Sequence, residues 1–211
     1  TSPVSVGKIV FGKYLAMAAV FVIPLLLFSF LPFFLSSYGT VPMAENFVAL
    51  LAFALYGLAA IAVGLFLSSL TENVVIAAVF TFIVLFLTYM MQGIESLISS
   101  TGNLATRILS VFDFYSHYSG MISAVSDVTG NSRLTTVFDL TSIVYFLSII
   151  VLMLFLTTQS IQKRRYTMSV KNFVMGAYSS IATAVAVALA VGVNLAAGAL
   201  PSNYTSVDVT T

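Results

Sequence analysis

The residues with the greatest potential for chemistry are His117, the only histidine in the chain, and Asp113, four residues before it. A metal site needs several ligands, and the chain contains no cysteine to complete a set. We therefore expect no catalytic residue and no metal site. Our preferred interpretation of His117 is a polar residue at a turn, and the alternative is a gate or a substrate contact.

Two Gly-Lys pairs near the start, Gly7-Lys8 and Gly12-Lys13, come nearest to a phosphate-binding loop. That loop requires Ser or Thr directly after the lysine, because the hydroxyl binds the magnesium ion of the nucleotide. Isoleucine and tyrosine follow the two lysines instead. We therefore expect this chain to bind no ATP by that route.

A third polar group, Thr71-Glu72-Asn73, stands immediately before a long apolar stretch. Short polar side chains and an acid are favourable at the start of a helix, where they satisfy free N–H groups and the helix dipole. Helix capping is thus the preferred interpretation. Contact between Glu72 and a partner protein is the alternative.

Five long apolar stretches must position these polar groups. Of the 211 residues, 60% are hydrophobic and only 7% are charged, whereas a soluble domain carries roughly 25% charged residues. A helix needs about 20 apolar residues to cross a bilayer. The sequence therefore predicts an all-α, polytopic transmembrane helix bundle. Its five spans are residues 14–35, 47–67, 74–91, 138–156 and 178–200.

The positions of the lysines and arginines orient these spans. With a cytoplasmic N-terminus, the outer segments hold only Arg107 and Arg133, and the positive-inside rule favours this choice. An odd number of spans then places residues 202–211 outside. The net charge of +1 provides no strong positive potential that would attract nucleic acid. The inner segments hold Lys8, Lys13, Lys163, Arg164, Arg165 and Lys171, of which Lys163, Arg164 and Arg165 form the orientation signal.

Residues 92–137, between the third and fourth spans, are not hydrophilic enough for a free loop. The pieces 108–112 and 121–125 are apolar but too short to cross the bilayer. Such pieces are typical of re-entrant or interfacial helices. We expect two short outer helices here, broken near His117 and Gly120.

The fifth span differs in composition from the other four. Residues 182–199 are rich in Ala, Val and Gly, and a polar, basic linker at 159–172 precedes them. Small residues permit close helix packing in lipid. They also suit a single-pass anchor, which is the interpretation that we favour.

Several short motifs, in order along the chain, together resemble type-2 ABC exporter permeases, and most of all their gliding-motility-associated branch. The resemblance covers residues 1–166. It is carried by residues 1–5, 12–16, 64–73 and 144–148, by Ser116-His117-Tyr118 with Gly120, and by Arg164-Arg165.

The remainder, residues 171–211, resembles the start of a companion auxiliary protein that has a membrane anchor and an outer soluble domain. Residues 194–197 and 207–210 carry this second resemblance, which suggests a natural fusion. The implied domains are 1–166, the C-terminal part of a permease transmembrane domain with four spans, and 167–211, a linker and single-span anchor. The permease's first two helices, and most of its coupling helix, would precede Thr1.

The resemblance implies a permease subunit of an ATP-driven exporter in a bacterial inner membrane. It implies no enzymatic activity and no cofactor in this chain, with ATP on a separate ABC ATPase subunit, and a second permease half in a homo- or pseudo-dimer. Coupling to the ATPase would involve Ser5, Lys8, Lys13 and Glu72. An outer gate would involve His117, Tyr118 and Gly120.

The spans themselves bear on the substrate. No lysine, arginine or glutamate lies in the five ranges, and Asp139 at the rim of the fourth is their only acid. Ion-coupled transporters normally carry such residues deep in the membrane. An amphipathic or lipid-like substrate therefore fits better. The alternative is a non-transporting scaffold that anchors an extracytoplasmic domain.

Overall fold

The computed structural model describes residues 5–39, 41, 43–98, 113–121, 137–165, 170–200 and 206–208. Within them, two three-residue strands, β1 (Val137–Asp139) and β2 (Ser206–Asp208), pair antiparallel with Phe138 opposite Val207. The helices are α1 (Val6–Ser29), α2 (Leu31–Ser36), α3 (Met43–Leu70), α4 (Val74–Ile98), α6 (Phe114–Gly120), α7 (Leu140–Arg165) and α8 (Val170–Gly198).

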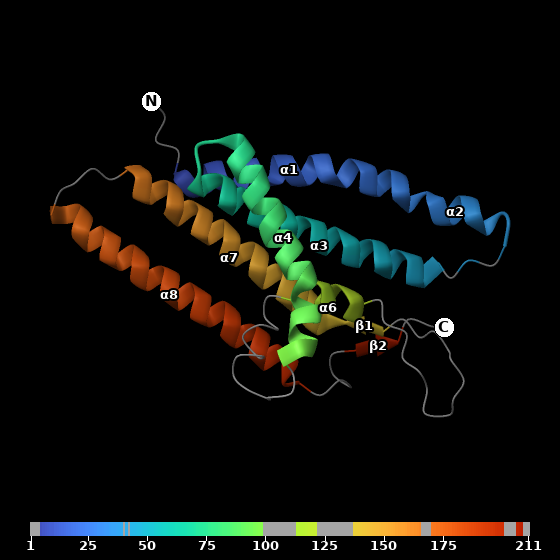
Figure 1. Ribbon diagram of the computed structural model, residues 1–211. Helices are drawn as coiled ribbons and strands as arrows, with labels where there is room; N and C mark the ends of the chain where they lie inside the picture. Colours follow the sequence, from blue (N-terminus) through green and yellow to red (C-terminus); the bar gives the residue numbers. More distant parts are fainter. Residues whose placement is uncertain are drawn as a thin grey trace.

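The predicted bundle of five spans is confirmed. Five helical segments of the described part are long and apolar enough to cross a membrane. Figure 1 shows α1, α3, α7 and α8 running roughly alongside one another, with α4 crossing them at an angle. The five segments are Val6–Ser36, Asn46–Leu70, Val74–Met91, Leu140–Lys163 and Tyr178–Gly198.

The best-buried part of the bundle lies between α3 and α7. On α3, Ala52, Ala59 and Ala62 are fully buried, and they belong to one apolar cluster with Tyr145 and Phe146 of α7. Because lipid tails are as apolar as these side chains, helices associate in a membrane mainly through close packing. The alanines of α3 permit that packing, and the large rings of α7 fill the space beside them.

The first span is broken near its end. Pro24 lies inside α1, which continues past it to Ser29, and a new helix, α2, begins at Leu31 with Pro32 in its first turn. Proline has no N–H to donate and its ring crowds the carbonyl four residues before it. The helix of this span is therefore interrupted at Phe30, two residues before Pro32.

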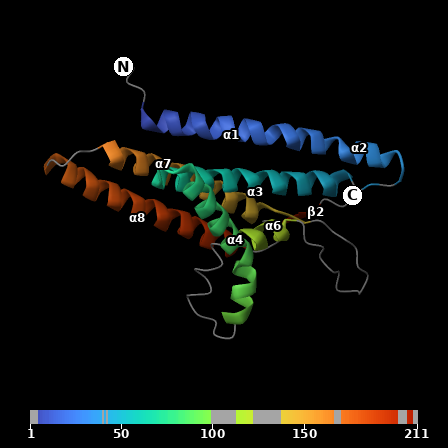
Figure 2. The ribbon, with the colours of Figure 1, turned by 45° about the horizontal axis from the view of Figure 1, so that its top comes forward.

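A tight turn joins the second and third spans. Only Thr71-Glu72-Asn73 separate α3 from α4. Near the turn the two helices pack closely, because a Cβ added at Gly64 of α3 would lie only 3.3 Å from Cγ2 of Thr81 in α4. Figures 1 and 2 show that α4 then diverges from α3, passes α6 and ends beyond it. The hairpin is thus closely packed only near its turn.

The boundaries around α7 differ from the prediction at both ends. Phe138 and Asp139 belong to β1, so the helix of the fourth span begins at Leu140. The predicted linker at 159–172 is wrong for residues 159–165, which continue α7. Lysine, arginine and glutamine are good helix formers, and basic side chains are favourable near a helix C-terminus.

Helix α8 packs along α7. Oγ of Ser179 donates to Oε1 of Gln159 at 2.6 Å, and Nδ2 of Asn194 donates to Oγ of Ser148 at 2.7 Å. Each hydrogen bond joins a polar group on one helix to a partner on the other. The fifth span is therefore held against the fourth by specific polar contacts as well as by small residues.

Candidate functional site

The first candidate site is built around Asp113, directly before α6. Its side chain is fully buried, and Oδ1 accepts a hydrogen bond from N of Ser116 at 2.9 Å. This is a helix N-cap, in which a carboxylate satisfies a free N–H of the first turn. Among the described residues, Oδ2 of Asp113 has no hydrogen-bond partner. The cap thus fixes where α6 begins, and it holds a carboxylate inside the protein.

The ring of His117 stacks on the ring of Tyr145. The ring centroids are 3.8 Å apart and the planes differ by 16°. Tyr145 is fully buried in α7, whereas His117 is half-buried in the last turn of α6. The imidazole therefore serves first as a packing surface that joins α6 to the fourth span.

Further rings complete what we call the aromatic cluster, which consists of Tyr56, Phe114, His117, Tyr118, Tyr145 and Phe146. Tyr56 of α3 has its ring 5.7 Å from that of Tyr118, and Phe114 stands edge-on to Tyr145 at 5.8 Å. Edge-to-face and tilted rings at these separations attract one another beyond simple burial. The cluster thus ties α3, α6 and α7 together at one end of the bundle.

The predicted break near His117 is wrong, because α6 is continuous through His117 and ends at Gly120. The predicted end at Gly120 is confirmed. A Cβ at Gly120 would meet no atom within 4 Å, so no close approach requires glycine there. Of the two apolar pieces predicted as short outer helices, residues 108–112 and 122–125 lie outside the described residues, and Met121 is fully buried after α6.

The second candidate site lies at the opposite end of the bundle, where α1 begins and α3 turns into α4 (Figure 1). Ser5 is the N-cap residue of α1, but its side chain makes no capping hydrogen bond. Lys8 and Lys13 follow in α1, and both are exposed. Gly7 and Gly12 have the spacing of a phosphate loop, but they lie inside this helix. The structure thus places all three predicted residues of α1 at one exposed helix start.

In the turn at this end, the predicted cap is confirmed and its residue is identified. N of Val75 donates to Oδ1 of Asn73 at 2.9 Å, so Asn73 caps α4. N of Asn73 in turn donates to Oγ1 of Thr71 at 3.2 Å. Glu72 takes no part in these two bonds, and its side chain is exposed. The turn therefore presents a carboxylate on the same end of the bundle as Lys8 and Lys13.

The predicted orientation signal closes α7. Lys163, Arg164 and Arg165 are its last three residues, and the side chain of Lys163 is exposed. The side chains of Arg164 and Arg165 lie outside the described part of the structure. Basic residues here are favourable for the dipole of α7.

Sequence reasoning missed the roles of three residues in the first site. Asp113 was considered only as a metal ligand, although its place three residues before Ser116 is a capping signal. Tyr145 and Tyr56 lie within apolar spans, and no local pattern distinguishes them from other core residues. Only the packing of α3 against α7 brings them beside α6.

Metal ligation receives no support within the described residues, where no group of three or more His, Asp or Glu side chains is placed to hold an ion.

A search of curated proteins and a search of solved structures each found no match. A family profile described as ABC-2 family transporter protein matches residues 1–158. Because the match covers well over half of the chain, the protein belongs to the ABC-2 family, the transmembrane subunits of ABC transporters.

Proposed function

We propose that the chain is the membrane half of an ATP-driven exporter for an amphipathic or lipid-like substrate. The family match over residues 1–158 carries this proposal. It is supported by the absence of lysine, arginine and glutamate from the apolar ranges 14–35, 47–67, 74–91, 138–156 and 178–200, since ion-coupled transport normally needs such groups deep in the membrane. ATP would be hydrolysed by a separate ABC ATPase subunit, and a second permease half would complete the pathway.

An apolar pocket between the first span and α3 supports the substrate class. It has a volume of about 540 Å³ and lies near the break between α1 and α2. Its walls are mainly leucine and phenylalanine, with Ser29 and Asn46 as the polar members. A pocket of this kind suits an acyl or other apolar tail whose polar end stays near the membrane surface.

The start of α1 is suited to receive force from an ATPase. Val10 and Tyr14 are buried against the bundle, and the hydroxyl of Tyr14 donates to the carbonyl O of Leu58 in α3 at 3.3 Å. A displacement of the exposed end of α1 would therefore be transmitted to α3 through these contacts. In this proposal Ser5, Lys8, Lys13 and Glu72 form the docking surface on the cytoplasmic side.

We further infer that residues 1–166 form the permease part, with its N-terminus in the cytoplasm of a bacterium. Residues 167–211 would be a fused anchor leading to an outer domain, as in the gliding-motility-associated branch. The change of composition at the fifth span supports this division. The hydrogen bonds from α8 to α7 would fix the anchor to the permease.

The test is purification of the complex from its native membrane, followed by reconstitution in liposomes. We expect a co-purifying ABC ATPase whose hydrolysis of ATP rises with a fluorescent lipid-like substrate. Leu50→Trp should fill the apolar pocket and abolish this stimulation. Leu51→Trp, on a neighbouring position that does not line the pocket, is the matched control.

The alternative is a scaffold that anchors an outer domain without transport. A purified complex that hydrolyses no ATP, with or without lipid, would establish that alternative. Strict stimulation by small hydrophilic ions would instead retain the transporter and contradict the proposed substrate class.

A further inference from the structure

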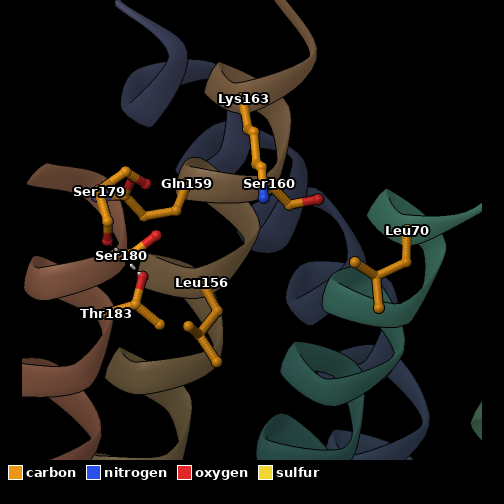
Figure 3. A pocket seen from close by; sticks show the side chains of 8 residues that line it. All are labelled: Leu70, Leu156, Gln159, Ser160, Lys163, Ser179, Ser180 and Thr183. Atoms are coloured by element: carbon orange, nitrogen blue, oxygen red, sulfur yellow. Dashed lines mark hydrogen bonds between the residues drawn. The ribbon is translucent and has the colours of Figure 1, made fainter. Parts of the chain in front are cut away.

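A second pocket, of about 590 Å³, lies between the end of α7 and the start of α8, on the side facing α3 (Figure 3). It is unlike the apolar pocket near α2. Leu70 and Leu156 form its apolar wall, and the remaining lining residues are polar. Among the described residues that line it, Lys163 is the only charged one and none is acidic. The chemistry of the lining therefore favours an anion.

The hydrogen bonds in this pocket leave donors for such an anion. Oγ of Ser179 donates to Oε1 of Gln159 at 2.6 Å, which leaves the amide nitrogen of Gln159 as the donating end of that side chain. The hydroxyl of Ser160 donates to the carbonyl O of Ser69 at 3.4 Å, a long bond that an anion in the pocket would replace. In Figure 3, the Lys163 side chain extends back along α7 to the level of Ser160. The ammonium of Lys163 thus lies near the hydroxyl of Ser160, which points toward α3, whereas the amide of Gln159 lies on the side toward α8.

The depth of the pocket in the bundle identifies the kind of anion. Lys163 is the last residue of the membrane-crossing segment Leu140–Lys163, and Leu156 lies two turns deeper in the same segment. A cation beside an apolar wall at the end of a span is placed at the level of lipid headgroups. Arg164, Arg165 and Lys171 lie close by in sequence and raise the positive charge of this end.

We propose that this pocket binds the phosphate group of an anionic phospholipid, with Lys163 as the ion-pairing residue and Gln159 and Ser160 as hydrogen-bond donors. A phosphate oxygen accepts charge-assisted hydrogen bonds from an ammonium more strongly than from neutral donors. Ser179, Ser180 and Thr183 of α8 line the other side of the pocket, so the bound lipid lies between α7 and α8 and stabilises the packing of the fifth span. This inference requires only that the chain is embedded in a bilayer, and it is independent of the transported substrate.

The experiment measures lipids retained by the full-length chain. The protein is extracted from bilayers containing equal amounts of phosphatidylglycerol and phosphatidylcholine, and bound lipids are counted by native mass spectrometry. We expect wild type to retain phosphatidylglycerol several-fold over phosphatidylcholine. Lys163→Gln should reduce this preference to near parity. Lys13→Gln removes an exposed lysine that does not line the pocket, and it should keep the preference.

The outcomes separate a local site from general attraction. An equal loss of preference in Lys163→Gln and Lys13→Gln overturns the proposal, as does an unchanged preference in Lys163→Gln. A second arm measures the thermal midpoint with inorganic phosphate and no added anionic lipid. A Lys163-dependent rise with phosphate alone, without selective lipid retention, supports recognition of phosphate but assigns it to a soluble source.

Discussion

The ring of His117 lies flat against the ring of Tyr145, with centroids 3.8 Å apart. This contact joins a short helix outside the five spans to a fully buried residue of α7. A histidine that gates a substrate path by its charge would need a free face. Here one face is covered by the phenol ring of Tyr145, so the imidazole packs α6 against the fourth span.

The first prediction concerns the aromatic nature of His117. His117→Ala removes the stacked ring and should lower the free energy of unfolding by about 1 kcal/mol, the usual worth of an aromatic pair. His117→Phe keeps a ring of similar size and should restore most of that loss. Thermal unfolding in detergent checks both. If His117→Phe matched wild type in stability but abolished transport in liposomes, the alternative role of His117 as a gate or substrate contact would be correct.

The second prediction concerns the buried cap at Asp113. Asp113→Ala removes the acceptor for N of Ser116 and should destabilise the protein by about 1 kcal/mol, as the loss of other N-caps does. Asp113→Asn keeps an oxygen acceptor but removes the charge, whose burial is costly. We therefore expect Asp113→Asn to be at least as stable as wild type. Chemical denaturation of both variants tests this, and equal destabilisation by the two would contradict it.

The sequence predicted those features that depend on local patterns. The five spans follow from apolar runs, and the cap at Asn73 follows from short polar residues before such a run. The break at Phe30 follows from Pro32, whose missing N–H cannot be replaced.

Features that depend on tertiary packing were not predictable in the same way. The extension of α7 to Arg165 was missed because polarity indicates where a membrane ends, and not where a helix ends. The aromatic cluster was missed because Tyr56 and Tyr145 are 89 positions apart. Their proximity exists only once α3 and α7 are packed.

The third prediction separates capping from docking in the turn between α3 and α4. Asn73→Ala should cost about 1 kcal/mol of stability, because N of Val75 loses its acceptor. Glu72→Lys should change stability by less than about 1 kcal/mol, since an exposed charge near a helix start contributes little more. We expect Glu72→Lys to lower the ATPase stimulation of the reconstituted complex. Stimulation that stayed at the wild-type level would exclude Glu72 from the docking surface.

The fourth prediction tests the contact between the first span and α3. A Cβ at Gly57 would overlap the ring of Phe21, so Gly57→Ala should displace that ring and weaken the contact. In a Phe21→Ala background the overlap is absent. There Gly57→Ala should be neutral or stabilising, because alanine is favoured over glycine inside a helix by about 1 kcal/mol. A double-mutant cycle by thermal unfolding measures the difference, and simple additivity would show that the two residues do not interact.

The fifth prediction asks how firmly the last span is held to the rest of the bundle. Nδ2 of Asn194 donates to Oγ of Ser148 at 2.7 Å and to the carbonyl O of Ala190 at 2.8 Å. Because only the first of these bonds crosses between helices, Ser148→Ala removes the interhelical bond and leaves the other intact. Interhelical hydrogen bonds in membranes average about 0.6 kcal/mol, so a coupling of this size is expected in a Ser148→Ala, Asn194→Ala cycle.

Its control is Thr183→Val, since the hydroxyl of Thr183 donates to the carbonyl O of Ser179 in its own helix at 2.8 Å. Within the described residues this hydroxyl forms no bridge to α7. Thr183→Val should leave the association of α8 with α7 unchanged, whereas loss of the Asn194 bond should make the connection between the two helices more open to protease. Equal cleavage of Ser148→Ala and wild type, with no coupling in the cycle, would mean that α8 is held by small-residue packing alone. Such a result would favour an independent anchor at residues 167–211 over a fifth span integrated with the permease.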